Sequence, residues 1–184
     1  MKGTVLYPPV SFDENEWFLV ISSALIWAVM IFLPKRLSVV SITVIWALNL
    51  CLAQTADFLI GKKPVQLYNY NDSERFEWSD VWLYVLSYPP AVYLFVYGLE
   101  KWKSCFHRNP WRIAFFITGA ALVTTGLEAA AVHYGVFQYY TWHLYYSFVV
   151  YLGVYGLNLW VYRLMLRSLG KPAGSLLVSR RKEE

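Results

Sequence analysis

Residues 37–60 read LSVVSITVIWALNLCLAQTADFLI, an apolar run of 24 residues in which Asp57 is the one charged side chain. A helix rises about 1.5 Å per residue, so about 20 apolar residues cross the hydrocarbon core of a bilayer. One similar run precedes this segment and three follow it, at residues 17–34, 81–99, 113–134 and 144–166. The sequence therefore predicts an all-α fold, a polytopic membrane bundle of five transmembrane helices in one domain over residues 17–166.

The distribution of basic residues predicts the orientation of this bundle, because cytoplasmic links of membrane proteins carry an excess of Lys and Arg. If the chain crosses five times, most of its sixteen basic residues fall on one side: Lys35, Arg36, Lys101, Lys103, Arg108, Arg112, Arg163, Arg167, Lys171, Arg180, Arg181 and Lys182. We therefore expect the N-terminal segment, residues 1–16, outside and the basic tail, residues 167–184, in the cytoplasm. The protein would be a multi-pass protein of the cell membrane.

The same basic residues indicate a contact with the membrane surface, since Lys and Arg next to the cytoplasmic end of a helix attract anionic lipid headgroups. The pI of about 9.0 follows from these clusters rather than from a nucleic-acid-binding face. We expect no nucleic-acid partner and no cofactor. The residues expected to contact anionic headgroups are Arg163, Arg167, Lys171, Arg180, Arg181 and Lys182.

Two acidic residues lie inside the predicted spans, where an ionised side chain is costly unless it has a partner. Asp57 lies about one turn from the outer end of the second span, with Gln54 and Asn49 near the same helix face. Glu128 lies in the fourth span, with Thr124 one turn away. We expect both carboxyl groups in the outer half of the bundle. A shared pocket would make them a candidate site, whereas an acid held by a buried Tyr or amide would be structural.

The fifth span carries a polar stripe whose members recur every three or four residues, on one helix face: His143, Ser147, Tyr151, Tyr155, Asn158 and Tyr162. Asp80 opens the third span, which also contains Pro89 and Pro90. These prolines are expected to kink or loosen the helix and to free backbone carbonyls near Leu86. A kinked helix beside a polar stripe can form a hydrated pocket, although such stripes are also typical of helix packing. The candidate ligand-binding residues are therefore Asp57, Asp80, Glu128, His143, Ser147 and Tyr151.

From the second span to the fifth, the chain resembles a known family. The resemblance is carried mainly by Glu128-x6-Gly135 and Trp142-x4-Ser147-x3-Tyr151, together with Asp57, Tyr68-x-Tyr70, Glu74, Glu77, Tyr88-Pro89 and Tyr139 or Tyr140. The family is an uncharacterised group of small five-helix membrane proteins found mainly in spore-forming Gram-positive bacteria. The resemblance implies the same fold and topology, and it implies no reaction or ligand.

Three classes of function remain open. The first is a non-enzymatic bundle with an outward-facing acidic pocket that binds or passes a cation or a small polar ligand. The second is a docking partner of another membrane protein, through the aromatic residues of 68–77 and 139–146. The third is a membrane enzyme that uses Glu128, Asp57 and His143. The sequence has no HExxH, phosphate-binding loop or nucleophile-elbow motif, so the first two classes are favoured.

Overall fold

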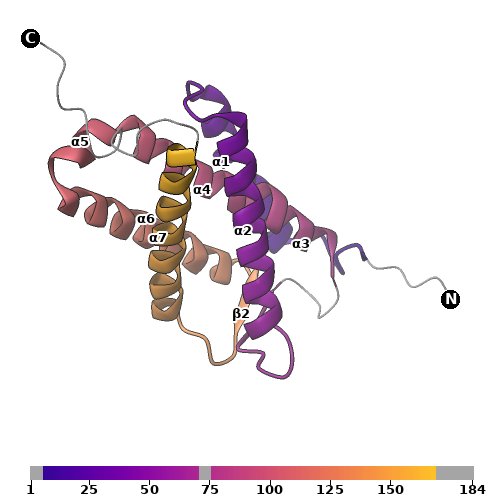
Figure 1. Ribbon diagram of the computed structural model, residues 1–184. Helices are drawn as coiled ribbons and strands as arrows, with labels where there is room; N and C mark the ends of the chain where they lie inside the picture. The colour runs from indigo at the N-terminus through magenta and orange to yellow at the C-terminus, as the bar shows by residue number, and fades with distance from the viewer. Residues whose placement is uncertain (1–5, 71–75, 169–184) are drawn as a thin grey trace, which may run out of the picture.

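The computed structural model describes residues 6–70 and 76–168, and it contains five helices that are long and apolar enough to cross a membrane (Figure 1). They are α1 (Glu14–Phe32), α2 (Val39–Ile60), a composite third span (Trp78–Lys101), α6 (Pro110–His133) and α7 (Leu144–Ser168). The short helix α5 (Lys103–Arg108) joins the third span to α6. The predicted number of spans is confirmed, and it indicates a multi-pass membrane protein.

Three of these spans begin where a polar side chain caps the first backbone amides. Asp13 and Glu16 form a reciprocal capping box that starts α1 three residues before the predicted start of the span. Ser38 accepts a hydrogen bond from the backbone N–H of Ser41 at 3.1 Å and starts α2. Asn109 caps α6 in the same way. These side chains provide acceptors for amides that have no partner within their own helix.

The third span is the most deeply buried of the five, and its helix type changes along its length. Helix α3 (Trp78–Trp82) leads into a π-helical turn, η1 (Leu83–Ser87), which is followed by α4 (Tyr88–Lys101). Pro89 and Pro90 have no backbone N–H, so regular α-helical bonds cannot form to the residues one turn earlier. The Leu86 carbonyl, which Pro90 leaves without its helical donor, accepts the indole N–H of Trp27 at 3.0 Å. The proline pair thus produces a widened turn whose freed carbonyl bonds to α1.

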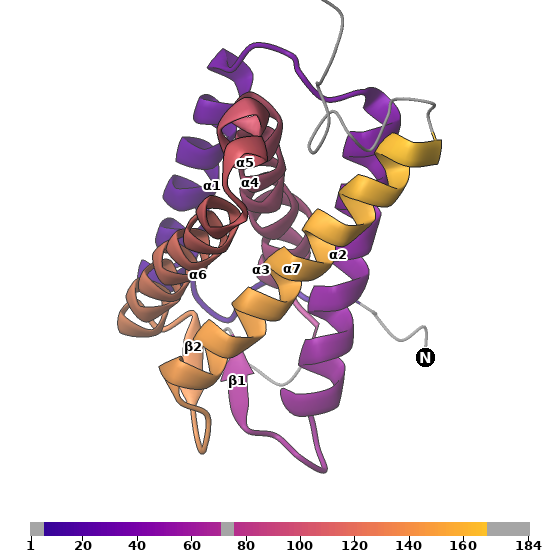
Figure 2. The same cartoon turned by 60° about the vertical axis from the view of Figure 1, so that its left-hand side comes forward.

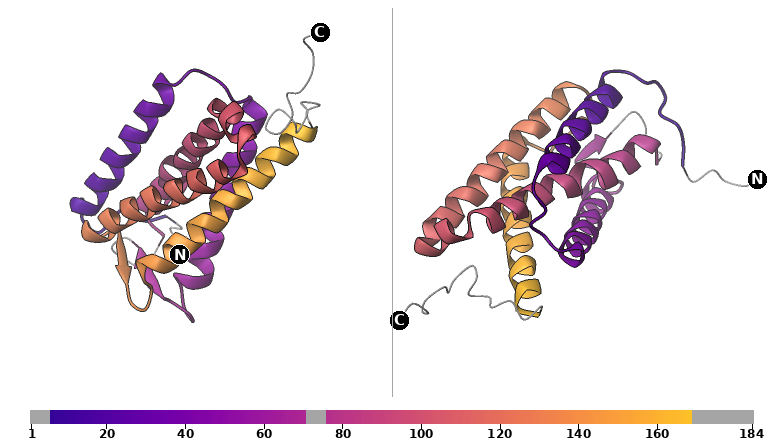
Figure 3. Two further views of the ribbon diagram at one scale, coloured as in Figure 1. Left: turned by 90° about the vertical axis from the view of Figure 1, so that its left-hand side faces the viewer. Right: turned by 90° about the horizontal axis from the view of Figure 1, so that it is seen from above.

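The third span is the main neighbour of α1, although Trp27 of α1 also contacts Trp46 of α2. Helix α1 lies on one side of it, and α2 and α7 lie on the other, with α6 packed along α7 (Figure 3). Asn49 of α2 and Asn158 of α7 exchange side-chain amide hydrogen bonds at 2.8 and 3.0 Å. Each amide also donates to a carbonyl of its own helix, at 2.8 and 2.9 Å. Both groups are buried, so this paired arrangement satisfies them and holds α2 against α7.

A small antiparallel ribbon, which the all-α prediction did not include, lies at one end of the bundle (Figure 2). It consists of β1 (Tyr68–Tyr70) and β2 (Phe137–Tyr139), with Tyr68 directly opposite Tyr139. The turn before β2 contains Gly135, whose φ of 78° suits a residue without a Cβ. The Leu67 carbonyl accepts backbone N–H groups from residues 140, 141 and 142 at 3.0 to 3.2 Å. We call this the ribbon end.

Part of the segment predicted as an N-terminal tail packs at the ribbon end. The backbone N–H of Tyr7 donates to the Phe76 carbonyl at 2.9 Å, and the N–H of Trp78 donates to the Tyr7 carbonyl at 3.0 Å. Tyr7 therefore pairs with the start of the third span, whereas residues 10–13 are exposed.

The first link, α5 and the last turn of α7 lie at the opposite end of the bundle (Figure 2). The described basic residues of that end are Lys35, Arg36, Lys101, Lys103, Arg112, Arg163 and Arg167, whereas Lys62 and Lys63 follow α2 at the ribbon end. Which end faces the cytoplasm stays a prediction. Four of the predicted lipid contacts, Lys171, Arg180, Arg181 and Lys182, lie outside the described residues.

Candidate functional site

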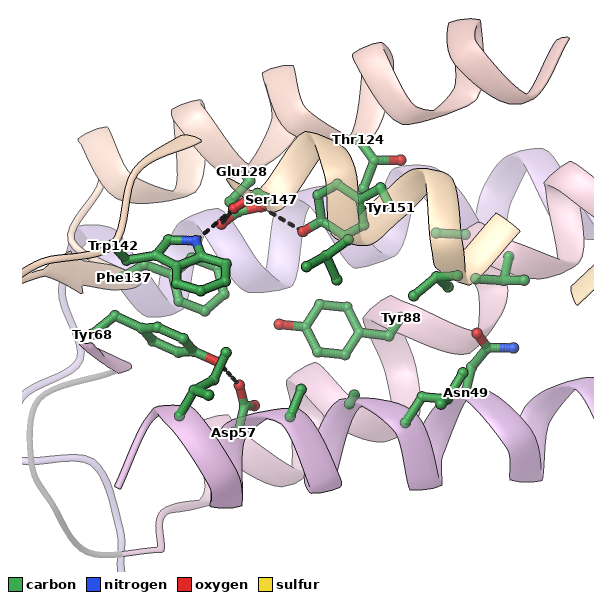
Figure 4. Close-up of a pocket in the computed structure, with 18 of the residues that line it drawn as sticks. Asn49, Asp57, Tyr68, Tyr88, Thr124, Glu128, Phe137, Trp142, Ser147 and Tyr151 are labelled. Atoms are coloured by element: carbon green, nitrogen blue, oxygen red, sulfur yellow. Dashed lines mark hydrogen bonds between the residues drawn. The ribbon is translucent and has the colours of Figure 1, made fainter. Parts of the chain in front are cut away.

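A cavity of about 170 Å³ lies between α2, α4, α6 and α7, next to the ribbon (Figure 4). Side chains with a polar atom make up much of its lining: Asn49, Asp57, Tyr68, Tyr88, Thr124, Glu128, Tyr139, Trp142, Ser147, Tyr151 and Tyr155. The remainder is apolar: Leu52, Ala53, Ala56, Ile60, Ala91, Val92, Phe137, Val150 and Val154. The two intramembrane acids therefore share one cavity, with Asp57 on the α2 wall and Glu128 on the α6 wall (Figure 4).

Three hydroxyl groups donate hydrogen bonds to the Glu128 carboxylate. Tyr139 of β2 and Ser147 of α7 both donate to Oε1, the serine at 2.7 Å. Tyr151, one turn further along α7, donates to Oε2 at 2.6 Å. The indole N–H of Trp142 donates to the Ser147 hydroxyl at 2.7 Å and extends this network. Glu128 thus connects α6 to the ribbon and to α7.

Two tyrosines hold the Asp57 carboxylate, which is 5% exposed. Tyr68 of β1 donates to Oδ1, and Tyr84 of the π-helical turn donates to Oδ2 at 2.6 Å. The widened turn around the prolines therefore presents one of the two donors of this acid. The other comes from the ribbon, as it does for Glu128.

The two ribbon tyrosines remain hydroxyl donors at physiological pH. Desolvation by burial is the main cause that raises the pKa of Tyr68, and the negative charge of Asp57 adds to it. Burial likewise raises the pKa of Tyr139, together with its hydrogen bond to Glu128. A raised pKa keeps each phenol neutral and able to donate to its carboxylate.

Tyr88 of α4 occupies the space between the two acids. Its side chain projects into the cavity with the hydroxyl between the Asp57 and Glu128 walls (Figure 4). Within residues 6–70 and 76–168, no hydrogen bond is found for this hydroxyl. It is therefore available to a bound molecule.

Among the described residues no salt bridge to either carboxylate is found, although the positive charge of Lys62, just after α2, acts on Asp57 from outside the cavity lining. The salt bridge found there joins Lys103 to Glu100 at 2.7 Å, at the opposite end of the bundle. Hydroxyl donors stabilise a carboxylate, but they do not neutralise its charge. Most of the surface exposed to the cavity is apolar, because the polar atoms of the lining largely bond to one another. An ionised acid there is costly without an opposite charge, so the cavity favours a cation.

The structure brings together four of the six predicted site residues, since Asp57, Glu128, Ser147 and Tyr151 all line the cavity. Asp80 does not line it. It is buried at the start of α3, where its carboxylate accepts the Glu77 backbone N–H at 2.7 Å in a capping box. The Glu77-x-x-Asp80 spacing before an apolar run is a signature of that cap.

His143 also lies away from the cavity. It is exposed just before α7, with its ring stacked against Tyr145 at a centroid distance of 5.4 Å. His143 therefore does not converge with Glu128 and Asp57 at the cavity, as the enzyme hypothesis expected. Gln54, expected on the face of Asp57, is exposed on α2.

Four tyrosines around the two acids are the residues that the sequence-based site omitted. Tyr68, Tyr84, Tyr88 and Tyr139 all line the cavity or bond to its acids. Their signal in the sequence was weak, because tyrosines near the ends of spans are commonly interfacial anchors. The need of each intramembrane acid for several donors was the argument that could have selected them.

Comparison of the chain with protein-family models, curated proteins and solved structures finds no match. The resemblance to a five-helix family of spore-forming bacteria therefore stays a prediction, and the case for function depends on the geometry of the cavity.

Proposed function

We propose that the protein is a non-enzymatic cell-membrane protein that binds a small cation or cationic polar ligand between Asp57 and Glu128. The observation that carries this proposal is the pair of acids on opposite walls of one cavity, with no Lys or Arg among the residues that line it. A bound monovalent cation would offset one of the two negative charges. The unpartnered Tyr88 hydroxyl between the acids adds a polar contact for the ligand.

A purely structural role explains less of this geometry. An acid that serves only to join helices is best placed in a packed interface, where its donors fill the space around it. Here both acids border an open volume of about 170 Å³. The tyrosine bonds thus position two charges at a cavity that has room for a further group.

The proposal includes an orientation, with the ribbon end outside and the end that carries Arg163 and Arg167 in the cytoplasm. The concentration of basic residues at the second end supports it. Ligand would then reach the cavity from the outer face. Arg163 and Arg167, at the end of α7, would lie near anionic headgroups.

Cation binding to the purified protein in lipid nanodiscs tests this function. We expect inorganic or organic cations to bind saturably to the wild type, as measured by isothermal titration calorimetry. Glu128→Gln keeps the shape of the side chain and removes its charge, and we expect its affinity to fall at least about tenfold. Asp57→Asn should also lower the affinity for the cation.

Glu100→Gln is the matched control. Glu100 also accepts a tyrosine hydroxyl, from Tyr162 at 2.9 Å, but it lies at the opposite end and does not line the cavity. Its replacement should leave cation affinity unchanged. Folded Glu128→Gln and Asp57→Asn variants that bind every tested cation as the wild type does would reduce both acids to a packing role.

A further inference from the structure

We infer that the ligand of this cavity is an organic ammonium ion of about five to eight non-hydrogen atoms, held by charge and by aromatic ring faces. This inference depends on the proposed function and specifies its ligand class. It follows from how the carboxylate oxygens are used, from the faces that line the cavity and from its size.

The acids offer charge but few free acceptor positions. Glu128 accepts three hydroxyl hydrogen bonds and Asp57 accepts two. A bare metal ion must replace its hydration shell with direct oxygen ligands, about six to eight for Ca²⁺. Binding it here would require several of these hydroxyl bonds to break. A fully alkylated ammonium ion needs no lone pair from the acids, because it has no N–H group and its charge is spread over its alkyl groups.

The placement of the acids also favours an organic cation over a metal. They project from opposite walls, with the Tyr88 ring between them (Figure 4). No group of three or more His, Cys, Asp or Glu side chains that could hold a metal ion occurs among residues 6–70 and 76–168. Two separated negative charges suit a ligand that is broad enough to approach both walls.

Aromatic side chains surround the space between the acids. Tyr68, Tyr88, Tyr139, Tyr151, Tyr155 and Trp142 all line it, from four different parts of the chain. Aromatic faces attract ammonium ions through the ring quadrupole, and cages of such rings recognise methylated amines. Trp142 lies 5.8 Å from the Tyr68 ring at an angle of 62°, so these two lining rings contact each other edge-on.

The volume limits the size of the ligand. A cavity of about 150 Å³ holds a molecule as large as benzene. The present cavity, at about 170 Å³, therefore fits tetramethylammonium, choline or a short alkylamine. Such a group could be a free amine or the terminal group of a lipid headgroup, and both sources share the same chemistry.

Calorimetric titration of the full chain in phosphatidylglycerol nanodiscs tests the ligand class. The probes are tetramethylammonium, choline, the neutral choline isostere 3,3-dimethylbutan-1-ol, Na⁺, K⁺ and Ca²⁺. We expect the two ammonium ions to bind, the neutral isostere to bind at least about tenfold more weakly, and Glu128→Gln to remove most of that preference. Glu100→Gln should bind as the wild type does.

Variants of Tyr88 test the role of the ring. Tyr88→Leu removes the aromatic face and should weaken choline binding about tenfold, whereas Tyr88→Phe keeps the face and should lose less than about threefold. Equal losses in both variants, or none in either, would contradict binding by the ring face. Circular dichroism and thermal unfolding confirm that both variants fold.

Nanodiscs that also contain phosphatidylcholine or phosphatidylethanolamine distinguish the two sources. Competition by these lipids against soluble choline supports a headgroup as ligand, and unchanged choline binding supports a free amine. Charge-dependent binding of inorganic cations without binding of either ammonium ion would overturn this inference and leave the proposed function in place. Absence of binding by every probe would overturn both.

Discussion

At the scale of single residues, the chemistry of this protein depends on neutral donors around two acids. Glu128 has three hydroxyl partners and Asp57 has two, and none of these five donors carries a charge. Each bond to a carboxylate is stronger than one between neutral groups. The acids are thus fixed in place while their charge stays available to a ligand.

Replacement of Glu128 by Leu should destabilise the fold much more than replacement by Gln. Leu leaves the hydroxyls of Tyr139, Ser147 and Tyr151 without an acceptor, and each unsatisfied buried group costs about 1–3 kcal/mol. Gln retains an amide that exchanges hydrogen bonds with hydroxyl groups. Denaturant unfolding in detergent micelles measures the difference. If Glu128→Leu is as stable as Glu128→Gln, the hydroxyl network contributes little to the fold.

The sequence drew attention to both acids that line the cavity, because an intramembrane carboxyl group is conspicuous in an apolar run. It also selected Ser147 and Tyr151, through the helical spacing of the stripe on α7. It could not separate Asp80 from them, since a cap and a ligand are both acids near a helix end. The ribbon tyrosines could not be selected from the sequence for a different reason. Their contacts with the acids depend on how the two links that contain β1 and β2 fold back over the helix ends.

At the scale of elements, the π-helical turn is the feature that shapes the site. A π-helical turn accommodates one residue more than the α-helix it interrupts, and such turns often occur at functional sites. Here it presents Tyr84 to Asp57 and is followed at once by Tyr88. The prolines were evident in the sequence, but the helix type and the indole partner from α1 were not. Both depend on the packing of a second helix.

The bond from Trp27 to the Leu86 carbonyl should stabilise the turn, because hydrocarbon offers that carbonyl no other donor. Trp27→Phe should therefore reduce the free energy of unfolding by about 1–3 kcal/mol. Adding Pro90→Ala supplies a backbone N–H one turn later, and we expect it to recover part of this loss.

Trp46→Phe is the control for ring size. Trp46 packs against Trp27 with ring centroids 5.7 Å apart, and no indole hydrogen bond is found for it among the described residues. Trp46→Phe should reduce the free energy of unfolding by less than Trp27→Phe does. A Trp27→Phe variant that behaves like Trp46→Phe, with no recovery by Pro90→Ala, would show that the carbonyl bond is unimportant.

At the scale of the whole molecule, the number and limits of the spans were predictable, because hydrocarbon thickness sets the length of an apolar run. The packing order of the helices was not. The central position of the third span follows from its tyrosines, glycine and prolines, which suit a buried environment, and from the polar contacts that it makes with α1 and α2. These contacts join residues that lie far apart in the sequence, so the packing order could not be predicted from it.

The proposed orientation can be checked by cysteine labelling, in a chain whose Cys51 and Cys105 are replaced by Ser. A thiol at the exposed Gln138, at the ribbon end, should react with a membrane-impermeant reagent added to intact cells. A thiol at the exposed Ser104 of α5 should react only after the membrane is opened. The reverse pattern would turn the cavity toward the cytoplasm and reject ligand access from outside.

The pairing of Tyr68 with Tyr139 has a consequence for how the chain folds. Two strands of three residues are too short to hold a register by themselves, and a shift of one residue would turn each tyrosine to the other face. Asp57 and Glu128 specify the register from the helix side of the ribbon. Asp57 accepts a hydrogen bond from the Tyr68 hydroxyl, and Glu128 accepts one from the Tyr139 hydroxyl. The acids therefore act as a template, and the register of the ribbon depends on the separation at which α2 and α6 hold them.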